Sequence, residues 1–406
     1  MRTRLILAVI LCMLLPISAL AALGQNETIF PPLPGEAPDI TSECAIEVSS
    51  QSSAVPALTD RDMHTYWEGR ANSKRLTITS PQKMYGLYIC WAQTPKDWRL
   101  SQAADGEVID TSLDAVGIQH QYVPLQGATK VQLMPGEGRN NWFGVRELYV
   151  FGEGDVPRFV QRWQMPDETC DLMLFTAHPD DEALFFGGLL PTYAGEMKKD
   201  VVVSLFSPVG NIRTSELLNA LWLAGVTNYP VLGPFRDFNS RSLERAYQQF
   251  DKATVYSYVT GMLRRYKPNV LITHDRAGEY GHGMHSICAD SAMKAFDFAA
   301  DPKRYPSSAK QYGAFQVQKL YLHLLADNPL IMDWDRPLPS FGGMTGFEAA
   351  QAAYGEHQSQ HRYTQFQVEP FLSDYSSYHF GLYKTMVGPD VYKNDFLENT
   401  ASALNP

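Results

Sequence analysis

The sequence predicts two domains of different fold class, an all-β sandwich over about residues 41–155 and an α/β domain with a parallel sheet over about residues 165–390. Short β-type runs separated by turn signals fill the first region, which contains no convincing long amphipathic helix. After about residue 165 the period changes, and apolar strand-like runs alternate with helical segments. The chain has 406 residues with 45% apolar content, which is enough material for two cores.

The first 22 residues are expected to be a secretory signal peptide. A basic start at residues 1–4 precedes an apolar core at 5–15, and ALA at 19–21 has the small-x-small pattern of a cleavage site. The apolar core is too short for a comfortable membrane span. We therefore expect a secreted or periplasmic mature chain that does not span the membrane after signal cleavage.

The sandwich is expected to follow a linker at residues 23–40, which contains the proline-rich run FPPLPG. Strands are predicted where β-type residues form short runs bounded by turn signals, and many short strands at this spacing favour an antiparallel arrangement. The predicted strands lie at residues 75–79, 84–91, 129–133 and 145–152.

The α/β domain is predicted from buried-strand runs that alternate with helical periodicity, a pattern typical of a parallel, Rossmann-like sheet. No glycine-rich dinucleotide fingerprint follows the first strand, so no nucleotide cofactor is implied. Residues 391–406 are expected to form a C-terminal tail. The predicted strands begin with the run at 172 and continue at 200–206, 270–273 and 319–324, with helices at 213–223 and 242–266.

Charge and cysteine content limit the possible partners and cross-links. The net charge of −10 and the lack of a basic run argue against nucleic acid as a partner. Four cysteines remain after the signal peptide, and an exported compartment permits disulfides. Cys44 and Cys90 could pair with each other, or all four could be buried thiols: Cys44, Cys90, Cys170 and Cys288.

Two clusters of ionisable residues indicate a metal site. His178 and Asp181 directly follow the first buried strand of the α/β domain, where open α/β sheets bind their ligands. Ionisable groups at the end of a buried strand are costly unless a cation or water serves them. About a hundred residues later, His282 and His285 lie one helical turn apart at the start of a predicted helix. The clusters together supply a His/Asp/His set with an open position, which is typical of a catalytic zinc site.

The chain at this point resembles the PIG-L/LmbE-like family of zinc-dependent deacetylases that act on N-acetylglucosamine-containing molecules. The resemblance depends on AHPDDE at 177–182 and YGHGMH at 280–285. It is strengthened by RTSE at 213–216, LAGV at 223–226 and HQSQ at 357–360, which occur in the family's order.

This resemblance implies a set of catalytic roles. His178, Asp181 and His285 would hold Zn²⁺, Asp180 would be the general base, and His282 would be the acid or the oxyanion partner. Catalytic zinc sites have three protein ligands of this kind and leave one position for water or substrate.

Further roles are expected around this centre. Tyr280 would lie at the mouth of the site, where its hydroxyl could help to bind the oxyanion. Arg213 and Asp237 are candidates for contacts to sugar hydroxyls, although Asp237 could equally be a solvated loop charge. Asp275 could orient a ligand imidazole from behind. Met284 departs from the family pattern, in which an aspartate often precedes the last histidine, and this leaves open how His282 or His285 is tuned.

The first domain resembles the discoidin, or coagulation factor type C, family of galactose-binding-like domains. The resemblance depends on LTD at 58–60, TYW at 65–67 and the closing run GVRELYVFG at 144–152. It implies a β-sandwich that could bind carbohydrate. Trp98 or Trp142 could stack on a sugar or complete the core, so no binding residue is named there.

The function that these observations predict is hydrolysis of the N-acetyl amide of N-acetylglucosamine-type sugars in a glycan or glycoconjugate, by a secreted zinc-dependent enzyme. One alternative is a zinc amidohydrolase that acts on a non-sugar amide. Another is an inactive glycan-binding protein, which Met284 favours and which the intact Asp180 disfavours.

Overall fold

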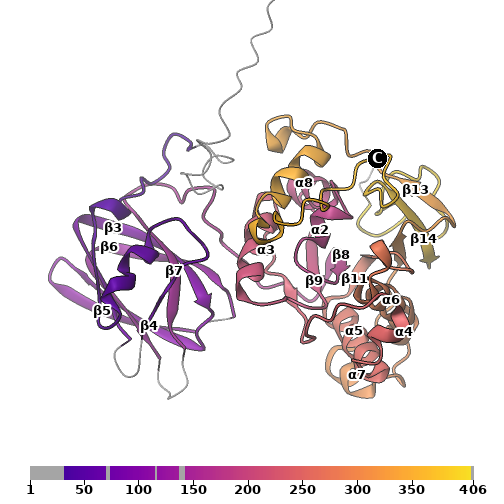
Figure 1. Ribbon diagram of the computed structural model, residues 1–406, viewed down its shortest axis with the longest axis horizontal. Coiled ribbons are helices and arrows are strands. Elements are labelled where there is room, and N and C mark those ends of the chain that lie inside the picture. Colours follow the sequence, from indigo (N-terminus) through magenta and orange to yellow (C-terminus); the bar gives the residue numbers. More distant parts are fainter. Residues whose placement is uncertain (1–31, 70–73, 115–116, 137–141, 404–406) are drawn as a thin grey trace, which may run out of the picture.

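The computed structural model describes residues 32–69, 74–114, 117–136 and 142–403, which form two regions with separate sheets (Figure 1). The expected signal peptide and the first part of the expected linker lie outside the described residues. Among the residues described, no helix is both long and apolar enough to cross a membrane.

The N-terminal region is an antiparallel sheet with the strand order β2-β7-β3-β6-β4-β5 and with β1 paired to β3. β3 and β6 are long, and their pairing contains register shifts. β3 also pairs with β1 and β7, and β6 also pairs with β4. The strands enclose one apolar core, in which Trp98 is completely buried, so this tryptophan serves packing. The strands are β1 (Ala45–Val48), β2 (Trp67–Glu68), β3 (Leu76–Gln93), β4 (Asp97–Ala104), β5 (Glu107–Asp114), β6 (His120–Pro135) and β7 (Gly144–Phe151).

The described part of the expected linker is in fact part of this region. Glu36 forms a bridge with Asp155, and Asp39 forms one with Phe151. These pairings fix the chain along the closing strand of the sheet, so residues 36–40 are structured rather than a spacer.

The C-terminal region contains a second sheet with the order β10-β9-β8-β11-β12-β14-β13. The first five strands in this order are parallel to one another, as the sequence predicts. The strands are β8 (Cys170–Thr176), β9 (Val201–Leu205), β10 (Val231–Leu232), β11 (Pro268–Thr273), β12 (Lys319–His323), β13 (Pro329–Ile331) and β14 (His379–Thr385).

The expectation of a wholly parallel sheet is wrong at one edge, because β14 is antiparallel to both β12 and β13. The segment before β14 remains at the edge where the parallel strands end, and there Glu369 accepts a hydrogen bond from Tyr280. A strand that starts from this edge runs back across the sheet, so it pairs antiparallel. The sheet is therefore mixed.

Two apolar clusters cover the two faces of the second sheet. Leu172 and Leu174 point into one cluster, whereas Met173 and Phe175 point into the other, as alternation along a strand requires. Figure 1 shows α2, α3 and α8 on one side of β8, β9 and β11, and α4 to α7 on the other. The helices are α2 (Asp181–Leu184), α3 (Asn211–Leu223), α4 (Leu243–Ala246), α5 (Lys252–Tyr266), α6 (Gly283–Ala300), α7 (Pro306–Tyr312) and α8 (Gly346–Tyr354).

Two further expectations need correction. The helix predicted at 242–266 is broken into α4 and α5, because Asp251 caps a new helix by accepting a hydrogen bond from the Thr254 backbone N–H. The expected tail is also part of the core, since Phe396 and Leu397 are completely buried among the apolar residues under the sheet.

The two regions meet through a buried polar contact on α3. Gln119 Nε2 donates to the Asn211 carbonyl oxygen at 2.9 Å and to Ser215 Oγ at 2.8 Å. His120 Nε2 lies 3.1 Å from the same Ser215 hydroxyl, and His120 Nδ1 lies 2.9 Å from Gln161 Oε1. The N-terminal region is thus hydrogen-bonded to the helix that also carries Arg213.

The four cysteines among the described residues are free thiols. Cys44 is partly exposed and Cys90 is buried, and they do not form a disulfide with each other in this structure. Cys170 and Cys288 are buried thiols as well.

Candidate active site

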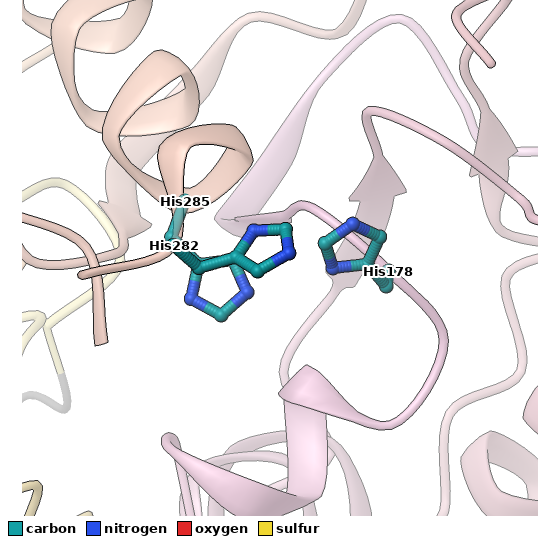
Figure 2. Close-up of side chains that lie close together, drawn as sticks. All are labelled: His178, His282 and His285. Carbon is teal, nitrogen blue, oxygen red and sulfur yellow. The ribbon is translucent and has the colours of Figure 1, made fainter. Parts of the chain in front are cut away.

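The predicted metal-site residues converge at the edge of the sheet where β8 and β11 end. His178 follows β8, and Asp181 is the first residue of α2. His282 is the N-cap of α6, and His285 lies in the first turn of that helix. Figure 2 shows the His178 ring facing the rings of the two later histidines, with ring centroids 5.0 Å and 5.4 Å away.

The donor atoms of these residues are close enough to share one cation. His178 Nδ1 is 3.3 Å from Asp181 Oδ2, and His285 Nε2 is 3.4 Å from Asp181 Oδ1. Ligand atoms of His178, His282 and His285 also lie within 4.8 Å of one another. The imidazole nitrogens and the carboxylate are the ligand types that Zn²⁺ takes in proteins.

A second group of possible ligands contains His274, but the hydrogen bonds of this residue argue against it. Ligand atoms of Asp181, His274 and His285 lie within 4.8 Å of one another. However, His274 Nε2 accepts the Ala177 backbone N–H at 3.0 Å, so its lone pair is occupied. The His178 ring, in contrast, has a buried Nε2 without a hydrogen-bond partner, although Asp237 Oδ1 lies 3.2 Å away. The donor set therefore fits a zinc site whose ligands do not include His274.

Asp180 lies beside this set and is held by Arg213. Arg213 Nη2 is 3.0 Å from Asp180 Oδ1, and the same guanidinium donates to the Pro179 carbonyl oxygen. Burial raises the pKa of the Asp180 carboxyl to about 7, although the Arg213 charge opposes the shift. Asp180 also has a φ of 111°, a strained backbone conformation of the kind that clusters at functional sites.

The neighbouring groups titrate differently. Burial alone would raise the pKa of Asp181, but the surrounding histidines, led by His285, hold it well below its usual value. Burial lowers the pKa of His282 to about 3, and the neighbouring imidazoles of His285 and His178 add to the effect. Asp181 is therefore a carboxylate and His282 a neutral imidazole in the absence of a cation.

The side chains of Arg213 and Tyr280 have other partners than the sequence suggested. Arg213 was a candidate for sugar contacts, but its guanidinium contacts Asp180. The hydroxyl of Tyr280 donates to Glu369, and burial together with this carboxylate raises the pKa of Tyr280. In this arrangement the Tyr280 hydroxyl is committed to Glu369 rather than directed at an oxyanion.

The expected role of Asp275 belongs to another residue. Asp275 Oδ2 accepts the Ala277 backbone N–H, which closes a local turn. The carboxylate that contacts imidazoles is Glu279, which accepts from Nδ1 of both His274 and His285 at 2.8 Å. Asp275 precedes the second histidine cluster in the sequence, but the chain turns once more before a carboxylate, that of Glu279, faces the histidines.

Two further buried histidines contact carboxylates: His323, which no sequence motif indicated, and His357, which lies in the HQSQ run at 357–360. His323 Nδ1 lies 2.5 Å from Glu279 Oε1, and His357 Nε2 lies 2.7 Å from Glu182 Oε1. His323 is the last residue of β12, next to β11 in the sheet. Its position at the end of a parallel strand is the signal that could have found it.

A cavity of about 150 Å³ opens onto the site. Carboxylates and imidazoles line one side of it, and aromatic and aliphatic side chains line the other. The lining residues are His178, Asp180, Asp181, Leu184, Phe185, Arg213, Asp237, Tyr280, His282, His285, Gln360 and Phe366.

The part of the chain that contains this site matches the model of a known protein family. Residues 173–296 match the family model for PIG-L, described as GlcNAc-PI de-N-acetylase. A protein of Frankia alni named 1D-myo-inositol 2-acetamido-2-deoxy-alpha-D-glucopyranoside deacetylase 1 is 30% identical over 174 residues, which are 36% of this chain and 59% of the relative. A protein of Catenulispora acidiphila with the same name is 27% identical over 210 residues, 45% of this chain and 64% of the relative. The chain therefore spans less than two thirds of either relative.

Two solved structures match parts of this chain at low sequence identity. N,N'-diacetylchitobiose deacetylase from Pyrococcus horikoshii has 18% identity and a TM-score of 0.37, and the match covers 48% of this chain and 70% of that chain. The family 32 CBM from C. perfringens NanJ, solved with galactose, has 14% identity and a TM-score of 0.24, with 29% and 98% covered. The segment 173–296, which matches the PIG-L family model, contains His178, Asp181, His282 and His285.

Proposed function

We propose that this protein is a secreted zinc-dependent deacetylase that hydrolyses the N-acetyl amide of N-acetylglucosamine-type sugars in a glycan or glycoconjugate. The single observation that carries the proposal is the placement of Asp180. Its carboxyl is buried in the same cavity as His178, Asp181 and His285, yet it belongs to neither group of possible metal ligands. The match of this segment to the PIG-L family and the names of the relatives support an amide-hydrolysing activity.

Zinc is the cofactor that the donor set suits. His178, Asp181 and His285 would hold it, and the neighbouring His282 faces the same point. A bound Zn²⁺ would polarise the acetyl carbonyl and lower the pKa of a bound water towards about 7.

The protein's own groups supply the proton transfers. Asp180 accepts the proton of the attacking water and returns it to the leaving amine, while Arg213 holds the carboxylate in place. His282 is neutral and lines the cavity, so an N–H of its ring can donate to the developing oxyanion. Tyr280 could join it only after leaving Glu369.

The N-terminal region would bring the enzyme to a carbohydrate. Its resemblance to discoidin-type domains supports carbohydrate binding, and the N-terminal sequence supports export. Tyr66 is 45% exposed, and Trp142 lies beside it with the ring centroids 6.2 Å apart, a surface on which a sugar could stack.

The decisive experiment is an acetate-release assay on purified mature protein with N-acetylated oligosaccharides, with and without a chelator. Zinc content is measured by elemental analysis on the same sample. We expect acetate release that a chelator abolishes and added Zn²⁺ restores.

The same assay separates the alternatives. Acetate release from simple amides but not from N-acetylated sugars would indicate a non-sugar amidohydrolase. Saccharide binding without any acetate release from the zinc-loaded protein would indicate a glycan-binding protein and would refute the proposed activity.

A further inference from the structure

A completely buried carboxylate lies behind the candidate metal site and is not among its ligands. Glu279 follows β11 in a single turn of 3-10 helix, Glu279–Gly281. Its side chain is 0% exposed and contacts three histidines from three different elements. The chain therefore gathers the end of β11, the start of α6 and the end of β12 on one carboxylate.

The hydrogen bonds around Glu279 assign the positions of the ring protons. A carboxylate accepts only, so each imidazole nitrogen that contacts it must carry a proton. Glu279 Oε2 contacts Nδ1 of His274 and Nδ1 of His285, both at 2.8 Å. Glu279 Oε1 contacts His323 Nδ1 at 2.5 Å. All three histidines thus carry a proton on Nδ1.

The Nε2 atoms of the three rings have different neighbours. Nε2 of His274 accepts the Ala177 backbone N–H at 3.0 Å. Nε2 of His323 lies 3.0 Å from the Ser376 carbonyl oxygen, which can only accept a hydrogen bond. Nε2 of His285 and Nε2 of His274 both lie near the Asp181 carboxylate, at 3.4 Å and 3.3 Å. The His274 nitrogen already accepts the Ala177 N–H, whereas the His285 nitrogen has no donor facing it among the contacts of the described residues.

An imidazole lone pair and a carboxylate oxygen that face each other repel unless a cation lies between them. We infer that Glu279 is a positioning residue that holds His285 in the Nδ1–H tautomer and so presents its Nε2 lone pair to the metal. This inference rests on the proposed metal-dependent function. Carboxylates that orient ligand histidines in this way typically contribute 10-fold to 100-fold to metal affinity.

The same contact accounts for the departure at Met284. The Met284 side chain is completely buried in the apolar cluster that contains Met173 and Phe175, together with Ile287 and Cys288. The carboxylate that orients the last histidine therefore comes from Glu279, six positions before His285, and not from the residue adjacent to His285.

Two measurements test the inference. The first is the tautomer of His285 in the metal-free protein, read by ¹⁵N NMR of histidine-labelled samples and assigned with a His285→Gln variant. We expect the proton on Nδ1. A proton on Nε2 of His285 would overturn the inference, even if every Glu279 variant failed to fold.

The second measurement is Zn²⁺ affinity by competition with a chromogenic chelator. Glu279→Gln keeps the shape, but its amide NH₂ cannot accept from the histidines, so we expect 10-fold to 100-fold weaker binding. Asp275→Asn is the matched control, because Asp275 lies in the same loop but its side chain accepts only a local backbone N–H. We expect the control to stay within twofold of the unmodified protein.

The outcomes distinguish this inference from the proposed function. If the unmodified protein binds no Zn²⁺, the zinc-dependent function fails, whatever the tautomer. If the unmodified protein binds Zn²⁺ and a folded Glu279→Gln binds it equally well, the positioning role of Glu279 fails while the proposed function stands.

Discussion

The contact between the two regions should make the stability of this protein depend on pH through one histidine. His120 is buried between Gln161 and Ser215, and burial, opposed by the hydrogen bond to Gln161 and assisted by the charge of Arg146, lowers its pKa to about 4. In the unfolded chain the same imidazole has its ordinary pKa of 6.5. When a histidine has a lower pKa in the folded state than in the unfolded state, the free energy of unfolding is highest at pH values above the unfolded-state pKa. It decreases as the pH falls from the unfolded-state pKa towards the folded-state pKa.

The size of the effect follows from these two pKa values. Because the unfolded chain is protonated first, the free energy of unfolding should fall by about 2 kcal/mol between pH 7 and pH 5, and by about 3 kcal/mol between pH 7 and pH 4. Other groups titrate in this range as well, so the contribution of His120 is obtained by comparison with His120→Gln. A glutamine remains neutral and can still form hydrogen bonds at the interface.

The assay is chemical denaturation of both proteins at pH 7 and pH 5, followed by tryptophan fluorescence. The unmodified protein should lose about 2 kcal/mol more than His120→Gln between the two pH values. An NMR titration of the His120 ring gives the folded pKa independently. Equal losses in the two proteins, or a folded pKa near 6.5, would refute the reasoning.

Four other changes have defined expected outcomes. Asp180→Asn should keep zinc and reduce acetate release by a factor of about 10² to 10⁴, since general-base assistance has that magnitude, and an unchanged rate would exclude Asp180 as the base. Asp181→Ala should lose metal and activity together, as measured by elemental analysis and acetate release. A truncated protein that begins at Val156 should melt at a lower temperature, because α3 loses its hydrogen bonds to the N-terminal region; an unchanged Tm would show that the regions are independent. Lys319→Met should destabilise the protein by about 3–5 kcal/mol in denaturant titrations, because Asp390 is left as a buried charge without its partner.

Local sequence was sufficient for the elements whose signals are local. The alternation of Leu172, Met173, Leu174 and Phe175 between two cores makes β8 a central strand wherever it lies in the fold. Parallel strands end at the same edge of their sheet, so residues directly after β8 and β11 were expected near one another. His178 and Asp181 follow β8, and the structure brings them to His285.

The antiparallel edge of the sheet and the buried C-terminus could not be predicted in the same way. The direction of β14 depends on where the preceding loop is held, and that is decided by contacts such as the one between Tyr280 and Glu369. Phe396 lies in a segment without periodicity, and its burial depends on a surface that forms only when β12 and β14 are paired.

The sequence by itself determined the two fold classes, the strand ends that carry the site and the types of donor available for a metal. Only the tertiary structure decided which carboxylate orients which imidazole. Glu279 and His323 are 44 residues apart, and neither has a motif of its own. A hydrogen bond between side chains depends on distances of a few tenths of an ångström, and these are determined by the packing of β11, β12 and α6 rather than by the spacing of residues along the chain.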